Sequence, residues 1–175
     1  LTANTTGATN TAIGVDCLQA NTTASNNTGV GHSALEANTT GAGSVAVGKN
    51  ALGANTTGAE NTAVGLHALL LNTTGTQNVA FGSSSLDACT TGDFNTAIGT
   101  SALGAVTTSD YNTGVGRSAG TAVTTGANNT CIGGDAGNAI TSGGSNTIIG
   151  KQAGVGGAPL TTGDSNTFVG FNVIA

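Results

Sequence analysis

The sequence repeats with a period of seventeen residues, and this period constrains the fold more than any other feature of the chain. A five-residue motif with the consensus Asn-Thr-Ala-Val-Gly recurs along the whole length. Its copies begin at residues 10, 27, 44, 61, 78, 95, 112, 129, 146 and 166, so only the last step, of twenty residues, departs from the period. A short period of this kind is typical of a solenoid, in which each unit is stable only when it is stacked on its neighbours.

The composition agrees with one ordered repeat domain over residues 1–175. Charged residues make up 6% of the chain and aromatic residues 3%, whereas 37% of the residues are hydrophobic and recur periodically. Disordered chains have high charge and low hydrophobicity, so we predict an ordered solenoid. Leu1 matches Leu35 and the chain also stops within a repeat, so we expect a segment of a longer fibre or filament.

The charge balance argues against several classes of partner. The net charge is −5, and the only basic side chains are Lys49, Arg117 and Lys151. A nucleic-acid surface needs clustered Lys and Arg, so we expect no nucleic-acid partner. No apolar run approaches the ~20 residues of a membrane helix, so we expect no membrane insertion. No basic and apolar leader is visible at the start.

Each unit predicts two short strands. Numbered from its Asn, the unit reads Asn-Thr-Ala-Val-Gly-x-x-Ala-Leu-x-Ala-Asn-Thr-Thr-Gly-x-x. Positions 1–5 and 8–12 have strand character, and glycines at positions 5 and 15 indicate corners. Segments this short between corners cannot form stable helices. We therefore predict an all-β, parallel β-solenoid of ten seventeen-residue coils, with a three-sided coil as an alternative.

Alternation along the first strand predicts that both of its faces are covered. Position 3 is Ala or Gly in most copies, and position 4 is always large and apolar. A strand that is apolar on both faces is usually covered on both, so we expect position 3 to contact a second chain and the protein to be a homo-oligomer. Position 4 is expected to form the structural core ladder, which comprises Ile13, Val30, Val47, Val64, Phe81, Ile98, Val115, Ile132, Ile149 and Val169.

The apolar positions change towards the carboxyl terminus. Position 9 changes from Leu to Gly120, Gly137 and Gly154, while position 12 changes from Asn to aliphatic residues and position 3 grows from Ala to Ile148 and Phe168. We predict a changed cross-section after about residue 105. The insertion at residues 156–160 is expected to form a projecting loop.

The repeated Asn and Thr residues admit several interpretations. Asn at position 1 predicts a ladder in which each side chain bonds its neighbour one coil away. Thr-Thr at positions 13 and 14 could bind ice, but adjacent strand residues face opposite sides, so we expect at most one outward row. Asn-x-Thr is also a glycosylation acceptor pattern. The candidate acceptors are Asn4, Asn21, Asn38, Asn55 and Asn72, with Asn26 and Asn128 in Asn-Asn-Thr.

Residues suited to catalysis or metal binding are sparse. Cys17, Cys89 and Cys131 occupy different repeat positions and are expected to be small buried hydrophobes. Asp93 and Asp110 stack at position 16, but calcium needs six to eight oxygen ligands. His32 has a neighbouring Ser33 and no carboxylate to orient it. We predict no enzyme activity, no catalytic residue, no metal site and no cofactor.

The segment Asn95–Leu103, Asn-Thr-Ala-Ile-Gly-Thr-Ser-Ala-Leu, resembles the head repeats of trimeric autotransporter adhesins. It is also similar to the Asn-Thr-Ala-Val-Gly arrays of phage and viral tail fibres and bacterial surface proteins. The resemblance implies a left-handed parallel β-roll in a side-by-side homotrimer. It also implies a location outside the cell, on a cell surface or a virion. The seventeen-residue length and the Asn-Thr-Thr-Gly segment depart from the adhesin repeat, and no ligand residue carries over.

These observations predict a structural or adhesive extracellular fibre segment, a stiff rod for surface attachment or display. Its expected partners are further copies of itself, in a trimer, and a cell-surface glycan or protein receptor. Two alternatives remain open at this stage. They are a subunit of a self-assembling extracellular filament and an ice-binding β-solenoid.

Overall fold

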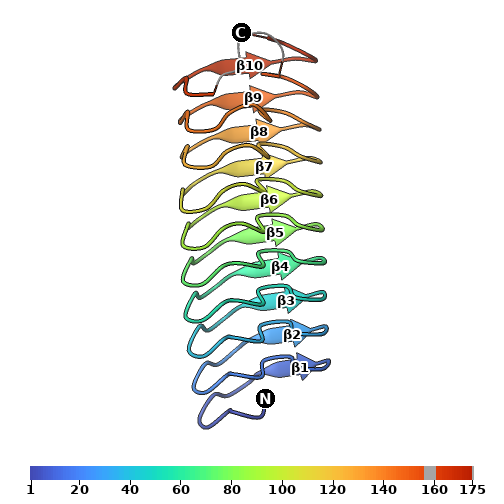
Figure 1. Cartoon of the computed structure of the whole chain (residues 1–175), viewed down its shortest axis with the longest axis vertical. Coiled ribbons are helices and arrows are strands. Elements are labelled where there is room, and N and C mark those ends of the chain that lie inside the picture. Colours follow the sequence, from blue (N-terminus) through green and yellow to red (C-terminus); the bar gives the residue numbers. More distant parts are fainter. Residues whose placement is uncertain (156–160, 175) are drawn as a thin grey trace.

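The computed structural model describes residues 1–155 and 161–174 and contains a single rod of stacked coils (Figure 1). Each repeat contributes one three-residue strand, and the described residues contain no helix. The strands are β1 (Thr11–Ile13), β2 (Thr28–Val30), β3 (Val45–Val47), β4 (Thr62–Val64), β5 (Val79–Phe81), β6 (Thr96–Ile98), β7 (Thr113–Val115), β8 (Thr130–Ile132), β9 (Thr147–Ile149) and β10 (Thr167–Val169). The predicted all-β parallel solenoid is thus confirmed.

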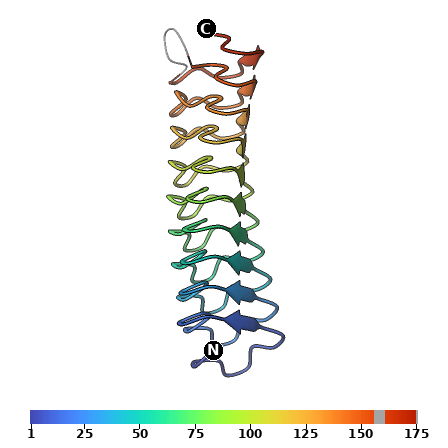
Figure 2. The same ribbon diagram turned by 90° about the vertical axis from the view of Figure 1, so that its right-hand side faces the viewer.

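The ten strands form one parallel sheet in sequence order, stacked along one side of the rod (Figure 2). Each strand residue pairs with its equivalent in the next repeat, as Thr11 does with Thr28. The register survives the twenty-residue step, because Thr147 pairs with Thr167. Residues 156–160, for which we expect a projecting loop, lie outside the described part of the chain.

The predicted second strand at positions 8–12 is wrong. Positions 7 and 9 both have left-handed backbone, for example φ +55° at Ser33 and +53° at Leu35, and such a backbone cannot continue an extended strand. The segment is a series of turns that nevertheless bonds the next coil. Leu35 N donates to Ala51 O at 3.1 Å, and Ala37 N donates to Gly53 O at 3.2 Å.

The interior of the coil is narrow and lies behind the small residues of the strand. Position 3 is buried in nearly every repeat, as are positions 8 and 9. Leu side chains from position 9 extend under the strand, so a Cβ added to Gly114 would lie 2.8 Å from Leu103 Cγ. Only small side chains fit at position 3 beside a Leu, and so this row faces inward rather than towards a second chain as we expected.

The predicted core ladder at position 4 consequently faces outward in the single chain, and its assignment to the coil interior is wrong. Of these side chains, Ile13 is 60% exposed, Phe81 56% and Val169 64%, whereas Val30, Val64 and Val115 are partly buried. Neighbouring strand residues point to opposite faces, so burial of position 3 puts position 4 outside. Both rows were correctly identified as apolar, but the two faces were interchanged.

The residues that fill the core change after residue 105, whereas the predicted change of cross-section stays a prediction. Val106, Val123 and Ile140 at position 12 are fully buried, and so are Cys131 and Ile148 at position 3. A Cβ added to Gly137 would lie 2.6 Å from Cys131 Sγ. The larger residue at position 3 therefore occupies the space that a Leu side chain fills in the earlier coils.

Candidate interaction surfaces

The strand face, which we define as the outward rows at positions 2 and 4, is the most apolar flat surface of the rod. Position 2 is Thr in every repeat except for Val45 and Val79, and position 4 is Val, Ile or Phe. The face therefore carries no charged side chain. Coils in a β-solenoid are spaced by ~4.8 Å and alternate strand residues by ~6.7 Å. Contiguous exposed apolar surface of this kind marks a site of interaction.

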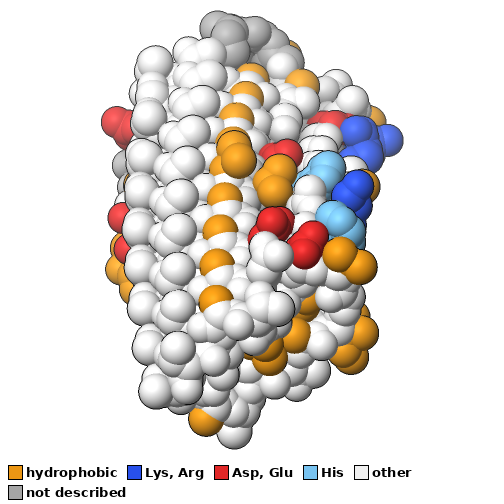
Figure 3. All heavy atoms as spheres, turned by 60° about the horizontal axis from the view of Figure 1, so that its bottom comes forward, with side chains coloured by type: hydrophobic (Ala, Val, Ile, Leu, Met, Phe, Trp, Pro, Cys, Tyr) orange, Lys and Arg blue, Asp and Glu red, His pale blue; other side chains and the backbone are white. Residues whose placement is uncertain are grey.

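The Thr-Thr surface, formed by positions 13 and 14, has one exposed row. Position 14 is exposed and position 13 is half-buried in the repeats. Position-13 hydroxyls donate to the carbonyl of the next coil, as Thr56 Oγ1 does to Thr73 O at 2.9 Å. One fully outward row agrees with the expectation, although this segment is a turn and not a strand. Figure 3 shows columns along the rod that carry neither hydrophobic nor charged side chains.

The Asn residues at position 12 form a buried ladder that the sequence pattern presented as glycosylation sites. Asn55 Nδ2 donates to Asn38 Oδ1 at 2.8 Å, and Asn72 Nδ2 donates to Asn55 Oδ1 at 2.8 Å. Asn21, Asn38, Asn55 and Asn72 are fully buried. The folded chain cannot present these amides to a glycosyltransferase, and so their assignment as acceptors is corrected to a structural role.

The remaining acceptor candidates differ in exposure. Asn4 is half-buried and its amide is engaged, because Nδ2 donates to Gly7 O at 2.9 Å and Oδ1 accepts from Asn21. Asn26 and Asn128 are exposed at position 17. Of the acceptor patterns in the sequence, these two are the ones that the folded rod displays.

The predicted ladder at position 1 is confirmed. Asn78 Oδ1 accepts from Asn95 N at 2.9 Å, and Asn95 Oδ1 accepts from Asn112 N at 2.9 Å. Most of these amides also donate to the carbonyl at position 15, fourteen residues on, as Asn61 Nδ2 does to Gly75 O at 2.7 Å. Two Asn ladders therefore run inside the rod, and only one was recognised from the sequence. The sequence feature that indicates the second ladder is the recurrence of Asn at position 12 in five successive repeats.

Among the described residues, one buried side-chain atom has no hydrogen-bond partner, and it marks the end of the position-12 ladder. Asn72 Oδ1 accepts no hydrogen bond, because the next coil has Cys89 where the earlier coils have Asn. The Cys89 thiol points instead to Gly92 O, at 3.6 Å. An unpaired buried acceptor costs ~1–3 kcal/mol, so the change in the core carries a local cost at this coil.

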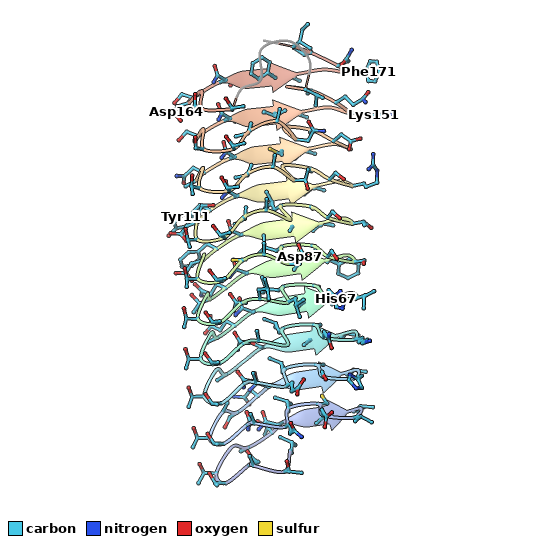
Figure 4. The ribbon with its side chains drawn as sticks, viewed as in Figure 1. His67, Asp87, Tyr111, Lys151, Asp164 and Phe171 are labelled. Atoms are coloured by element: carbon cyan, nitrogen blue, oxygen red, sulfur yellow. The ribbon has the colours of Figure 1, made fainter. Side chains whose placement is uncertain are left out.

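The carboxylates at position 16 bind backbone groups of the preceding coil. Asp93 Oδ1 accepts from Thr76 N at 2.6 Å, Asp110 Oδ1 accepts from Asp93 N at 2.8 Å, and Asp164 Oδ1 accepts from Gly144 N at 2.7 Å. They join adjacent coils at the corner that precedes the strand. Figure 4 shows Asp164 and Tyr111 at this edge, opposite His67 and Lys151.

The three cysteines are free thiols inside the rod, as expected. Burial raises the pKa of the Cys89 thiol to about 11 and that of the Cys131 thiol to about 12. A thiolate is the reactive form of cysteine, so both are poor nucleophiles and poor metal ligands at neutral pH.

Groups suited to catalysis are not brought together among the described residues. Ser33 Oγ lies 3.0 Å from His32 Nδ1 on the surface, but residues 1–155 and 161–174 contain no pocket. The same residues contain no cluster of three His, Cys, Asp or Glu side chains able to hold a metal ion. The surfaces, rather than a cavity, are therefore the candidates for function.

Within the described part of the chain, no helix has the length and apolar character needed to span a membrane.

Comparison with known proteins identifies no relative. No protein-family model matches the chain, and neither the curated proteins nor the solved structures contain a significant match.

Proposed function

We propose that the chain is a stiff segment of an extracellular fibre or adhesin, in which three copies pack side by side through their strand faces. The coils are left-handed in this proposal, and the fibre belongs to a cell surface or a virion. One observation carries the proposal, namely the outward row of Val, Ile and Phe along the whole strand face. Side chains such as Ile98, which is 40% exposed, remain in contact with water in the isolated chain.

The energetics favour covering this face. Burial of apolar surface contributes about 25 cal/mol per Å². The row contains ten large side chains in a straight line, so a flat partner covers all of them at once. The regular spacing of the rod makes a second copy of the same chain a matching partner. The uncharged Thr-Thr surface then remains outward, available to a cell-surface glycan or protein receptor.

The test is the mass of the native protein in solution, together with a charge placed on the strand face. We expect sedimentation equilibrium to give three times the chain mass. Ile98→Lys should dissociate the trimer, since it buries an unpaired ammonium group. Thr57→Lys, the matched control on the Thr-Thr surface, should leave the mass unchanged. A wild-type chain that remains monomeric at all concentrations would contradict the proposal.

Ice binding is a second candidate function, and the same face now favours it. The sequence pattern lacked two outward Thr rows, but the strand face presents a Thr row beside a row of β-branched residues. Both rows are uncharged and regularly spaced, at ~4.8 Å by ~6.7 Å, as an ordered water layer requires. A monomer that shows thermal hysteresis, lost in Thr113→Tyr, would support ice binding over the trimer. An oligomer that shows no thermal hysteresis would contradict ice binding.

A further inference from the structure

The repeats can be compared with one another, and the comparison singles out one exposed row. Positions 6 and 17 are mostly exposed, and their ten copies hold nine and eight residue types respectively. Position 14 is exposed in all ten copies and holds a hydroxyl side chain in every one. Because positions 6 and 17 of the same coils have diverged, the constancy of position 14 is not a remnant of a common repeat. We define the outer Thr row as Thr6, Thr23, Thr40, Thr57, Thr74, Thr91, Thr108, Thr125, Ser142 and Thr162.

The fold does not require a hydroxyl in the outer Thr row. At position 13, Thr73 Oγ1 donates to Thr90 O at 3.0 Å, whereas within the described part of the chain no side chain of the outer Thr row bonds another protein group. The backbone of the row does bond the next coil, as Thr74 N does to Thr90 O at 3.3 Å, but nearly every residue type supplies an N–H. Hydrogen bonding therefore accounts for Thr at position 13 and leaves Thr at position 14 unexplained.

The turn holds the outer Thr row in a fixed geometry. Thr90 O accepts from Thr73 N at 2.8 Å, from Thr73 Oγ1 at 3.0 Å and from Thr74 N at 3.3 Å. The arrangement recurs one coil earlier, where Thr73 O accepts from two atoms of Thr56 and from Thr57 N. The exposed hydroxyl and methyl groups are thus spaced by the coil repeat of ~4.8 Å. A surface that is rigid before binding loses little conformational entropy when it binds.

The surroundings of the outer Thr row are uncharged. The three basic and eight acidic side chains of the chain occupy positions 6, 7, 10, 16 and 17 of the repeat. Positions 11 to 15 hold no charged and no aromatic residue in any repeat. The surface around position 14 therefore offers neutral hydroxyl groups and methyl groups.

These properties select among ligands. Residues 1–155 and 161–174 contain no pocket, so a ligand of the row has to be flat or extended. A charged polymer finds no opposite charge on the row, and sugar rings find no aromatic side chain on which to stack. A hydroxyl group both donates and accepts hydrogen bonds, as a water molecule does. The coil spacing of ~4.8 Å is also close to the repeat of the oxygen lattice on an ice surface.

We propose that the outer Thr row is an ice-binding surface. It is more regular than the strand face, where Val45 and Val79 interrupt the Thr row and Phe81 projects from the aliphatic row. The outer Thr row lies on a turn and remains outward when strand faces associate. Ice binding at this row therefore does not depend on whether the chain is a monomer or a trimer.

Lysine substitutions on and beside the row test the proposal. Thr74→Lys with Thr125→Lys places two ammonium groups on the row, and ice cannot replace their hydration shells. We expect this variant to lose more than about half of the thermal hysteresis of wild type at equal concentration. The matched control is Gln77→Lys with Asn128→Lys, which adds the same charge to exposed position-17 residues of the same two coils and should keep the wild-type hysteresis.

Two further measurements accompany the hysteresis. Fluorescently labelled wild type and control should be incorporated into a growing ice crystal, and the row variant should be excluded from it. Circular dichroism and sedimentation should be the same for all three proteins, because position 14 is exposed and its hydroxyl bonds no other group of the rod.

The outcomes separate this inference from the proposed function. A wild-type chain of any mass that shows no hysteresis and is excluded from ice overturns the ice-binding row and leaves the strand-face trimer standing. Equal losses in the row variant and its control, or a loss in Thr113→Tyr alone, also overturn it. A monomeric wild type whose hysteresis is lost in the row variant only contradicts the trimer and supports the ice-binding row.

Discussion

The coils before residue 112 and those after it fill the same interior in two different ways. In the earlier coils, Leu at position 9 packs behind a small residue at position 3, and position 12 is Asn except for Cys89 and Val106 in the last two of them. In the later coils position 9 is Gly, position 12 is Val or Ile, and position 3 grows to Cys131 and Ile148. The strands nevertheless pair in one continuous register. The backbone of the coil is therefore compatible with more than one packing, provided that the total volume is conserved.

The backbone at position 9 explains why Gly can replace Leu there. Leu52 has φ +52° and Gly137 has φ +61°, so the left-handed conformation is common to both regions. This conformation costs a residue with a Cβ ~1–2 kcal/mol, whereas full burial of a Leu side chain contributes ~1.5–3 kcal/mol. Leu is retained where its side chain fills the interior, and Gly is accommodated where position 3 fills it. The coil that begins at residue 112 has Gly114 at position 3 and Gly120 at position 9. The side chain of Leu103, from the preceding coil, fills the interior beside both glycines.

The largest effect is expected at the glycine of position 5, which the two regions share. A Cβ on Gly65 would lie 2.6 Å from the carbonyl carbon of Gly82, and one on Gly133 would lie 2.6 Å from that of Gly150. Both residues also have φ near +130°. Gly65→Ala and Gly133→Ala should each lower the free energy of unfolding by about 4 kcal/mol or more. Denaturant unfolding at fixed protein concentration measures this, and a clear difference between the two would show that coil spacing differs between the regions.

The second largest loss of stability is expected when the buried Leu of an earlier coil is shortened. Leu52→Ala should cost about 3–4 kcal/mol, within the range for buried Leu. Leu52→Gly removes more apolar surface but relieves the left-handed strain, so it should cost no more than Leu52→Ala. This order reverses the usual preference for Ala over Gly. A Gly variant that is less stable than the Ala variant by 1 kcal/mol would contradict the strain argument.

The opposite exchange tests whether volume decides the packing of the later coils. Gly137→Leu should cost about 2–3 kcal/mol, because the added side chain overlaps Cys131. Combined with Cys131→Ala, which recreates the earlier packing, the cost should fall by at least about 1 kcal/mol. A double-mutant cycle measures this coupling. Additive effects would mean that positions 3 and 9 do not compete for space.

The Asn ladder should tolerate apolar replacement only at its end. Asn55→Val removes the donor to Asn38 and the acceptor for Asn72, so we expect a loss of about 2 kcal/mol. Cys89→Val lies one coil beyond the ladder and resembles Val106, so its effect should stay below about 1 kcal/mol. Equal costs for the two variants would indicate that the ladder contributes no more than ordinary packing.

At neutral pH the smallest effect is expected from the thiols at and beyond the junction, because their influence on stability begins only above pH 9. The folded pKa values of Cys89 and Cys131 lie above the unfolded value of 9.0, so the folded state holds these protons more tightly. Unfolding should become easier as the pH rises above 9, by about 1 kcal/mol per thiol and pH unit up to about 11. Unfolding curves of wild type and of Cys89→Val/Cys131→Ala should diverge over this range. Parallel pH profiles would count against the thiols as the cause.

Part of this structure follows from local pattern. The Asn at position 1 and the exchange between positions 3, 9 and 12 were predicted correctly, because stacking in register places equivalent residues together. The second strand was not predicted correctly, because left-handed backbone at Ser33 and Leu35 is imposed by the coil and runs against their residue types. The Asn at position 12 matches a glycosylation acceptor pattern in the sequence but forms a buried ladder in the structure, and the two look alike in one dimension.

The parallel solenoid, its register and the apolar character of two rows follow from the repeat, because a strict period makes every residue stack on its equivalent. Which of those rows faces inward depends on packing across the coil. Alternation along a strand separates two faces but does not orient them, and here the Leu side chains of the opposite wall leave room for Ala and not for Val. The large aliphatic row is thereby left on the outside of the rod.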